Sequence, residues 1–161
     1  MGTIEELLNQ LHGRHVYLDT NVLIYFLDRN PDYFTVASAV IEAIESGSIA
    51  GYTGDAVVAE ILVKPYRSGS IELVSGIKAF FQTENFLTIC HHDAEAFDLA
   101  AQLRAKYNQK FIDALHYATA IRSGCHAIIT NDNGIRNSEN LDVISLSRFH
   151  MDSDIFSGDL D

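Results

Sequence analysis

The sequence predicts an α/β fold, a three-layer α/β/α sandwich around a central, mainly parallel sheet. Short apolar runs of strand length alternate along the chain with longer stretches in which apolar residues recur at helical spacing. Those longer stretches can return the chain to the same end of a sheet, as parallel strands require. With 161 residues, 47% of them hydrophobic, the chain suits one compact domain. We expect that domain to span residues 1–150, followed by an acidic tail at 151–161.

The apolar runs predict five strands, at residues 16–18, 49–53, 86–90, 126–130 and 141–146. Ser70 and Asp93 are expected to cap the helices that follow them, and Pro65 to end or kink the helix that begins at Ala56. The periodic stretches predict helices that include residues 4–11, 22–26, 36–44, 56–64, 73–81, 96–103 and 111–123.

The formal net charge of −11 is unusual for a nucleic-acid binder, because such proteins displace counterions from phosphates with basic patches. Carboxylates gathered in one pocket would be neutralised by divalent cations, and the predicted tail holds further acidic residues without a basic one. The few basic residues expected to gather near the functional site are Lys64, Arg67, Arg104, Lys106 and Lys110. The tail could fold over the groove of these basic residues as a weak competitor for nucleic acid, although a disordered tail is the simpler interpretation.

The amino terminus is acidic and amphipathic, and no stretch approaches the length of a membrane span, so we expect a cytoplasmic protein without membrane contact. Cys90 and Cys125 lack metal-type spacing and are expected to be buried thiols without a disulfide. Adjacent residues of a strand point apart, so His91 and His92 are interpreted as surface histidines. Phe80, Phe81, Phe97 and Tyr117 are interpreted as core residues.

Asp19 follows the strand at 16–18 directly and therefore stands at the carboxyl end of that strand. In open α/β sheets this edge is where ligands bind, because the loops diverge there and leave a crevice. Asp19 could equally be only the N-cap of the helix that follows. The position alone does not separate the two interpretations.

Three further carboxylates can reach the same edge: Glu60, Asp113 and Asp132. Each has a simpler explanation when it is taken alone. Glu60 could pair with Lys64 one turn later, Asp113 could complement a helix dipole, and Asp132 could form an Asx turn. The convergence of all four at one edge is harder to explain without a function.

Four neighbouring carboxylates raise one another's pKa values and require compensation by cations. Oxygen ligands suit hard cations, so Mg²⁺ or Mn²⁺ is expected, whereas zinc would require histidine or cysteine at metal-type spacing. Carboxylate-held divalent ions commonly catalyse the hydrolysis of phosphodiesters. The sequence therefore favours a metal-dependent phosphodiesterase.

Four short motifs occur in order, and together they resemble the PIN domain family. They are Leu18-Asp-Thr-Asn-Val-Leu-Ile-Tyr25, Ala59-Glu60, Phe111-Ile-Asp-Ala-Leu-His-Tyr-Ala-Thr-Ala120 and Ile129-Thr-Asn-Asp132. The resemblance runs from about Val16 to Leu146 and implies a PIN-like fold. It also implies an endoribonuclease, often a VapC-type toxin that pairs as a homodimer and is inhibited by an antitoxin inserted into the acidic groove.

Carried over by position, the resemblance makes Asp19, Glu60, Asp113 and Asp132 the catalytic and metal-binding residues for Mg²⁺ or Mn²⁺. Asn21 and Thr130 match polar positions that flank this quartet and orient it. The role of His116 is left open: it could pack or form a hydrogen bond near the site, but no proton transfer is assigned to it.

Other functions compete with this one. A phosphatase of the haloacid dehalogenase type would need an aspartate at the position of Asn21, and a receiver domain offers no role for Glu60 together with Asp113. An RNA-processing nuclease outside a toxin system remains an alternative. So does a PIN module that binds metal and a partner without cleaving RNA.

Overall fold

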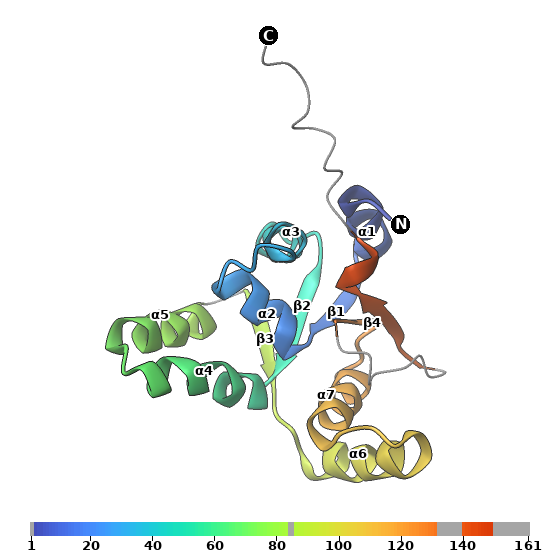
Figure 1. The fold of residues 1–161 in the computed structure, drawn as a ribbon. Helices are drawn as coiled ribbons and strands as arrows, with labels where there is room; N and C mark the ends of the chain where they lie inside the picture. The colour runs from blue at the N-terminus through green and yellow to red at the C-terminus, as the bar shows by residue number, and fades with distance from the viewer. Residues whose placement is uncertain (1, 84–85, 132–139, 150–161) are drawn as a thin grey trace.

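A five-stranded parallel sheet forms the centre of the computed structural model, which describes residues 2–83, 86–131 and 140–149 (Figure 1). The strand order is β3-β2-β1-β4-β5, and every pairing between neighbours is parallel. The predicted mainly parallel sheet is thus confirmed and is parallel throughout its five strands. The strands are β1 (His15–Leu18), β2 (Ala50–Gly54), β3 (Leu87–Cys90), β4 (Ala127–Thr130) and β5 (Asp142–Ser145).

Helices cover both faces of this sheet (Figure 1). Buried residues of α1 to α5 pack into one core cluster, and those of α6 and α7 pack into a second. The helices are α1 (Ile4–Leu11), α2 (Thr20–Leu27), α3 (Phe34–Glu45), α4 (Ala56–Ser68), α5 (Ile71–Gln82), α6 (Ala94–Tyr107) and α7 (Phe111–Arg122), and a 3-10 turn, η1 (Leu146–Arg148), follows β5. The three-layer α/β/α arrangement is confirmed.

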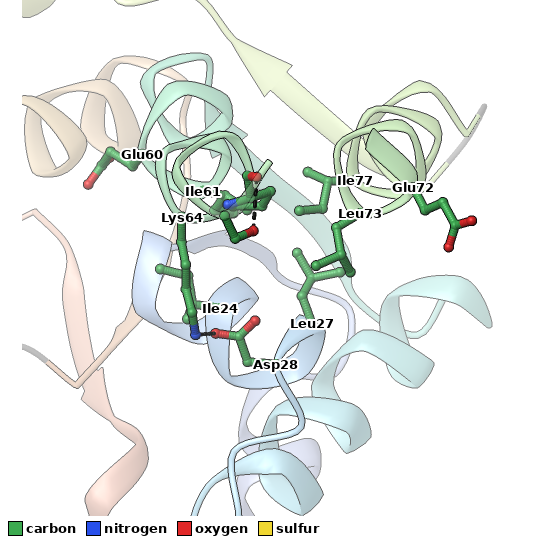
Figure 2. Close-up of a pocket in the computed structure, with 12 residues that line it drawn as sticks. Ile24, Leu27, Asp28, Glu60, Ile61, Lys64, Glu72, Leu73 and Ile77 are labelled. Carbon is green, nitrogen blue, oxygen red and sulfur yellow. Dashed lines mark hydrogen bonds and ion pairs between the residues drawn. The ribbon is translucent and has the colours of Figure 1, made fainter. Parts of the chain in front are cut away.

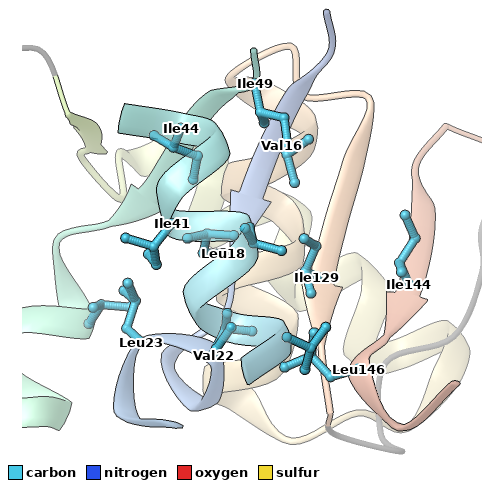
Figure 3. Packing of buried hydrophobic residues seen from close by; sticks show 14 of the residues in the cluster. Val16, Leu18, Val22, Leu23, Ile41, Ile44, Ile49, Ile129, Ile144 and Leu146 are labelled. Carbon is cyan, nitrogen blue, oxygen red and sulfur yellow. The ribbon is translucent and has the colours of Figure 1, made fainter. Parts of the chain in front are cut away.

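The strands β1 and β4 contribute side chains to both cores, because successive side chains of a strand point to opposite faces of the sheet. Val16 and Leu18 of β1 belong to the first core, whereas Tyr17 belongs to the second. Ile129 and Ile128 of β4 divide in the same way, and all five side chains are fully buried. Figure 3 shows Val16, Leu18 and Ile129 in the first core. A strand covered on both faces reads as a continuous apolar run, which is why these strands were predictable.

Helix ends follow local chemistry closely. Ser70 accepts a hydrogen bond from the backbone N–H of Leu73, and Asp93 accepts one from Ala96, which confirms both predicted caps. Thr3 and Glu6 form a reciprocal capping box at the start of α1.

Pro65 does not end α4, which continues to Ser68 and stops at Gly69 in the left-handed conformation, with φ of 71°. Of the two alternatives expected for Pro65, an end or a kink of the helix, the end was therefore wrong. A proline inside a helix lacks the N–H for one hydrogen bond, and its ring crowds the carbonyl of the residue four positions earlier. Here the Pro65 ring is buried beside α5, so packing offsets part of this cost.

Phe97 was expected in the core, yet 46% of it is exposed. Ala96, Ala100 and Leu103 occupy the buried stripe of α6, so Phe97 falls one position outside that stripe. It stacks instead on Phe111, with ring centroids 6.3 Å apart.

Both cysteines are free thiols; Cys125 is buried as expected, whereas Cys90, also expected to be buried, is only half-buried because it ends the edge strand β3. Within the described ranges, no helix is both long and apolar enough to cross a membrane. The predicted acidic tail at 151–161 lies outside the described residues, as does Asp132.

Replacing Ile129 by alanine tests the two-faced core. We expect the free energy of unfolding, measured by urea denaturation, to fall by about 2–5 kcal/mol, because a fully buried side chain would leave a cavity. Ile71→Ala is the control, since Ile71 is 81% exposed and should change stability by less than about 0.5 kcal/mol. Equal effects of the two substitutions would contradict this packing.

Candidate active site

Asp19 stands where β1 ends and α2 begins, and its carboxylate is only 4% exposed. Oδ1 accepts a hydrogen bond from the backbone N–H of Thr20 at 2.8 Å, and Oδ2 accepts one from Thr130 Oγ1 at 2.7 Å. Asp19 is therefore the N-cap of α2 and also a buried carboxylate at the carboxyl edge of the sheet. The two interpretations of the sequence are compatible, and Thr130 contacts the carboxylate that it was expected to orient.

The pKa of Asp19 is raised above its usual range, chiefly because burial penalises the charged carboxylate. Glu60 raises it further, whereas the nearby His116 and the hydrogen bonds from Thr130 and Thr20 oppose the effect. A buried carboxylate of this kind would be stabilised by a cation.

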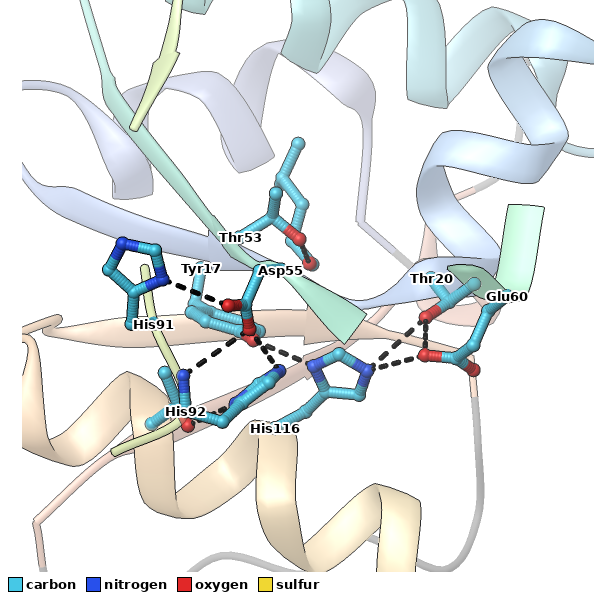
Figure 4. Close-up of polar contacts among 10 residues, drawn as sticks. Tyr17, Thr20, Thr53, Asp55, Glu60, His91, His92 and His116 are labelled. Carbon is cyan, nitrogen blue, oxygen red and sulfur yellow. Dashed lines mark hydrogen bonds and ion pairs between the residues drawn. The ribbon is translucent and has the colours of Figure 1, made fainter. Parts of the chain in front are cut away.

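Glu60 projects from α4 toward Thr20 and His116 (Figure 4). Its Oε1 accepts hydrogen bonds from Thr20 Oγ1 at 2.8 Å and from His116 Nε2 at 2.7 Å. Burial alone would raise the pKa of Glu60, but these two hydrogen bonds lower it more, and the net shift is downward. The possible pairing with Lys64 is not formed, because Lys64 contacts Asp28 at 3.5 Å.

Asp113 lies in the first turn of α7 and is 5% exposed. His116 and Thr119 follow it at intervals of three residues, so the three polar side chains share one face of the helix. His116 and Thr119 are each 1% exposed. Asp113 stands one helical turn before His116, whose ring contacts Thr20 and Glu60.

Of the other predicted site residues, Asn21 lies half-buried in the first turn of α2, and Asp132 lies outside the described residues. Within the described ranges, no three histidine, cysteine or acidic side chains form a metal-binding group. Asp19 and Glu60, which both accept a hydrogen bond from Thr20, offer only oxygen donors. This donor chemistry fits a hard divalent cation such as Mg²⁺ or Mn²⁺.

Several polar residues of this region were not assigned from the sequence. Tyr17 donates or accepts a hydrogen bond with His116 Nδ1 at 2.7 Å, and Thr20 bridges toward Glu60. The alternation of β1 could have shown that Tyr17 and Asp19 share a face of the sheet. Nothing in the sequence indicated which helix supplies the partner of Tyr17.

His92 is buried and was wrongly interpreted as a surface residue; its side chain is 6% exposed, against 90% for His91. The two histidines do point apart, but one of the two directions leads inward. His92 Nδ1 lies 2.6 Å from Thr119 Oγ1, and Asp55 contacts both histidines (Figure 4). Burial and the nearby His116 lower the pKa of His92.

A groove of about 360 Å³ adjoins Glu60 between α2, α4 and α5 (Figure 2). Its lining is mainly apolar and includes Ile24, Leu27, Ile61 and Leu73. The Asp28–Lys64 ion pair and Glu72 add charged groups to the lining.

The class of protein follows from the fold and this edge together: a parallel α/β/α domain with the buried carboxylate of Asp19 at the carboxyl end of its first strand and Glu60 joined to it through Thr20. The sequence pattern of the PIN domain family matches residues 16–140. The chain belongs to the PIN domain family. Comparison with curated proteins gives no match.

Solved structures share the fold at low sequence identity. VapBC2 of Rickettsia felis, bound to a DNA fragment of its promoter, superposes with a TM-score of 0.64 at 18% identity, over 81% of this chain and 98% of that one. A toxin–antitoxin complex of Klebsiella pneumoniae superposes with a TM-score of 0.60 at 17% identity, over 78% of this chain and 94% of that one. VapC20 of Mycobacterium tuberculosis, a toxin that cleaves the sarcin–ricin loop, superposes with a TM-score of 0.57 at 15% identity, over 70% of this chain and 86% of that one. The chain therefore has the fold of VapC toxins.

The raised pKa of Asp19 predicts a cost to stability that depends on pH. Because the folded state holds the Asp19 proton more tightly, stability falls as pH rises from the ordinary pKa of 3.8 through the higher folded value. Asp19→Asn removes this cost, so in EDTA the variant should have a higher Tm than the wild type at pH 7. Each kcal/mol regained raises Tm by about 2–4 °C in a chain of this size.

The difference in Tm between Asp19→Asn and the wild type should shrink as the pH is lowered to about 4. Asp32→Asn is the matched control, because Asp32 is exposed. The Tm of Asp32→Asn should equal that of the wild type at both pH values. An Asp19→Asn variant that is no more stable than the wild type at pH 7 would refute this account of the carboxylate.

Proposed function

We propose that this chain is an endoribonuclease that depends on Mg²⁺ or Mn²⁺ and acts as the toxin of a toxin–antitoxin pair. One observation carries the proposal: Asp19 is a buried carboxylate at the carboxyl edge, where it accepts hydrogen bonds from Thr20 and Thr130. Glu60 accepts a hydrogen bond from the hydroxyl of Thr20 as well. Buried carboxylates at one edge are costly unless they serve a cation. Membership of the PIN domain family and the fold shared with VapC toxins support the same function.

In this mechanism Asp19, Glu60, Asp113 and Asp132 would hold the divalent ion. Bound there, the ion would supply a water of lowered pKa and would neutralise charge that develops on the phosphodiester. The residues of the chain keep the ligands in place. Thr130 and the Thr20 N–H fix the two oxygens of Asp19, and Thr20 Oγ1 fixes Glu60, so little reorganisation is needed when the substrate binds.

RNA is the proposed substrate, and Lys64, Arg67, Arg104, Lys106 and Lys110 are the basic residues proposed to attract it. The net charge of −11 makes this attraction depend on the cation bound at the carboxylates. We further propose that residues 1–150 form a single domain and that residues 151–161 form an acidic tail. The protein is proposed to be a homodimer in the cytoplasm.

An antitoxin segment is the proposed occupant of the groove beside Glu60. Two of the solved structures with this fold are toxin–antitoxin assemblies. The groove offers an apolar lining with charged groups around it, which suits an amphipathic helix or extended segment. Such a segment would cover the approach to Glu60 and inhibit the enzyme.

Cleavage of total cellular RNA by the purified protein, with Mg²⁺ or Mn²⁺, tests the activity. We expect discrete fragments that disappear in EDTA, and rates reduced by about 10²-fold or more in Asp19→Asn and Asp113→Asn, because each removes a preorganised charge. Asp32→Asn should cleave like the wild type. Full metal-dependent cleavage by Asp19→Asn would refute the mechanism, and intact metal binding without cleavage would favour the non-cleaving module.

The groove is tested by co-purification with the product of a small reading frame adjacent to the gene. Leu73→Glu places a charge in the groove and should weaken that complex by about 10-fold or more, because burying an unpaired charge is costly. Ile71→Glu is the control, since Ile71 is more exposed and does not line this groove. Equal retention of the partner by both variants would contradict this binding site.

A further inference from the structure

Tyr17 places a phenol inside the molecule, in the middle of β1, where its side chain is fully buried. A tyrosine hydroxyl is protonated at neutral pH, so Tyr17 brings a hydrogen-bond donor into the interior. A buried hydroxyl requires a hydrogen-bond partner. Within the described part of the chain, that partner is His116 Nδ1 at 2.7 Å.

This contact determines which nitrogen of His116 carries the proton. A neutral imidazole has one N–H, so when Nδ1 accepts the Tyr17 O–H the proton resides on Nε2. His116 Nε2 lies 2.7 Å from Glu60 Oε1 and can then donate to the carboxylate. The hydrogen bonds run in one direction, from Tyr17 through His116 to Glu60 (Figure 4).

Glu60 is held asymmetrically by this arrangement. Oε1 accepts from both His116 Nε2 and Thr20 Oγ1, whereas Oε2 has no donor among the described residues. The Glu60 side chain is 32% exposed and projects from a helix, so without these donors several rotamers would be open to it. Two donors on one oxygen select a single carboxylate orientation and leave the other oxygen available.

We propose that Tyr17 and His116 are positioning residues, which fix the Glu60 carboxylate through one oxygen so that the other can bind the divalent cation. This inference rests on the proposed metal-dependent function. Neither residue touches the substrate in this role. Their effect is exerted through Glu60.

The surroundings of His116 restrict its ring from the other side. The His92 ring packs edge-on against it with centroids 5.4 Å apart, and His92 is itself bound to Thr119 at 2.6 Å. Gly54 ends β2 without a side chain, and a Cβ at that position would collide with the Tyr17 hydroxyl and the His92 ring. The backbone of β2 thus leaves room for the chain of hydrogen bonds.

The tautomer of His116 is the first measurement. Long-range ¹H–¹⁵N correlation spectra of metal-free, ¹⁵N-labelled protein report which imidazole nitrogen carries the proton, and the His116→Gln spectrum identifies the His116 signals by their loss. We expect the Nε2–H form in the wild type and a loss of this exclusive form in Tyr17→Phe. An Nδ1–H form of His116 in the wild type would overturn the proposal.

Binding of Mn²⁺, followed by the EPR signal of the free ion, is the second measurement. Residues that orient metal ligands typically change metal affinity by about 10–100-fold, so His116→Ala should weaken binding within that range. His116→Gln should restore part of the affinity, because its amide nitrogen can replace the Nε2–H donor. Tyr17→Phe should weaken binding, with its ring still filling the core.

Tyr52→Phe is the matched control. Tyr52 pairs with Tyr17 in the sheet register and also contacts a histidine, His15, through its hydroxyl at 3.1 Å. That contact lies at the opposite, amino-terminal edge, so Tyr52→Phe should leave the His116 tautomer and Mn²⁺ affinity unchanged. Circular dichroism and thermal unfolding establish that each variant is folded before it is compared.

The outcomes separate this inference from the proposed nuclease function. Wild-type Mn²⁺ affinity in folded His116→Ala overturns the positioning role, even if Asp19→Asn abolishes RNA cleavage. Weakened binding in His116→Ala with recovery in His116→Gln supports the role, even if no RNA is cleaved. An equal loss in Tyr52→Phe and Tyr17→Phe would also overturn it, because the effect would not depend on Glu60.

Discussion

The parallel direction of all five strands is the constraint on which the rest of the structure depends. Because every strand points the same way, the loops after β1, β2 and β4 all begin at one edge, and the helices that return the chain cover both faces. Asp19 is placed at that edge by the end of a fully buried strand. Because the Asp19 carboxylate is buried away from water, neighbouring protein groups must donate its hydrogen bonds.

The polar residues at this edge form a connected set rather than isolated pairs. Thr20 contributes its backbone N–H to Asp19 and its hydroxyl to Glu60, which joins a strand end to a helix. His116 then connects Glu60 to Tyr17 in the second core. A buried network specifies one arrangement when its members are satisfied, and it is costly when a single member is removed. The orientation of Glu60 is thereby tied to the packing of β1 against α7.

The contrast between Asp19 and Glu60 shows how environment divides similar groups. Burial dominates at Asp19 and raises its pKa, whereas hydrogen bonds from His116 and Thr20 outweigh burial at Glu60 and lower its pKa. Glu60 is therefore the more readily ionised of the two. In the proposed function a bound cation would compensate mainly the cost at Asp19, which links stability of the fold to occupancy of the site.

The sequence by itself determined the strands, the parallel α/β/α fold and the candidate carboxylates, because these depend on short-range patterns. Apolar runs, helical spacing and capping residues such as Ser70 and Asp93 are local, and Asp19 could be placed at a strand end from its immediate neighbours. Tertiary structure decided what depends on contacts between distant segments: α4 continues through Pro65, Phe97 lies outside the buried stripe, and His92 points inward. It also decided that His116 binds Tyr17, 99 positions away, and Glu60, 56 positions away. No local pattern encodes such a partner, since it is fixed only when β1, α4 and α7 pack together.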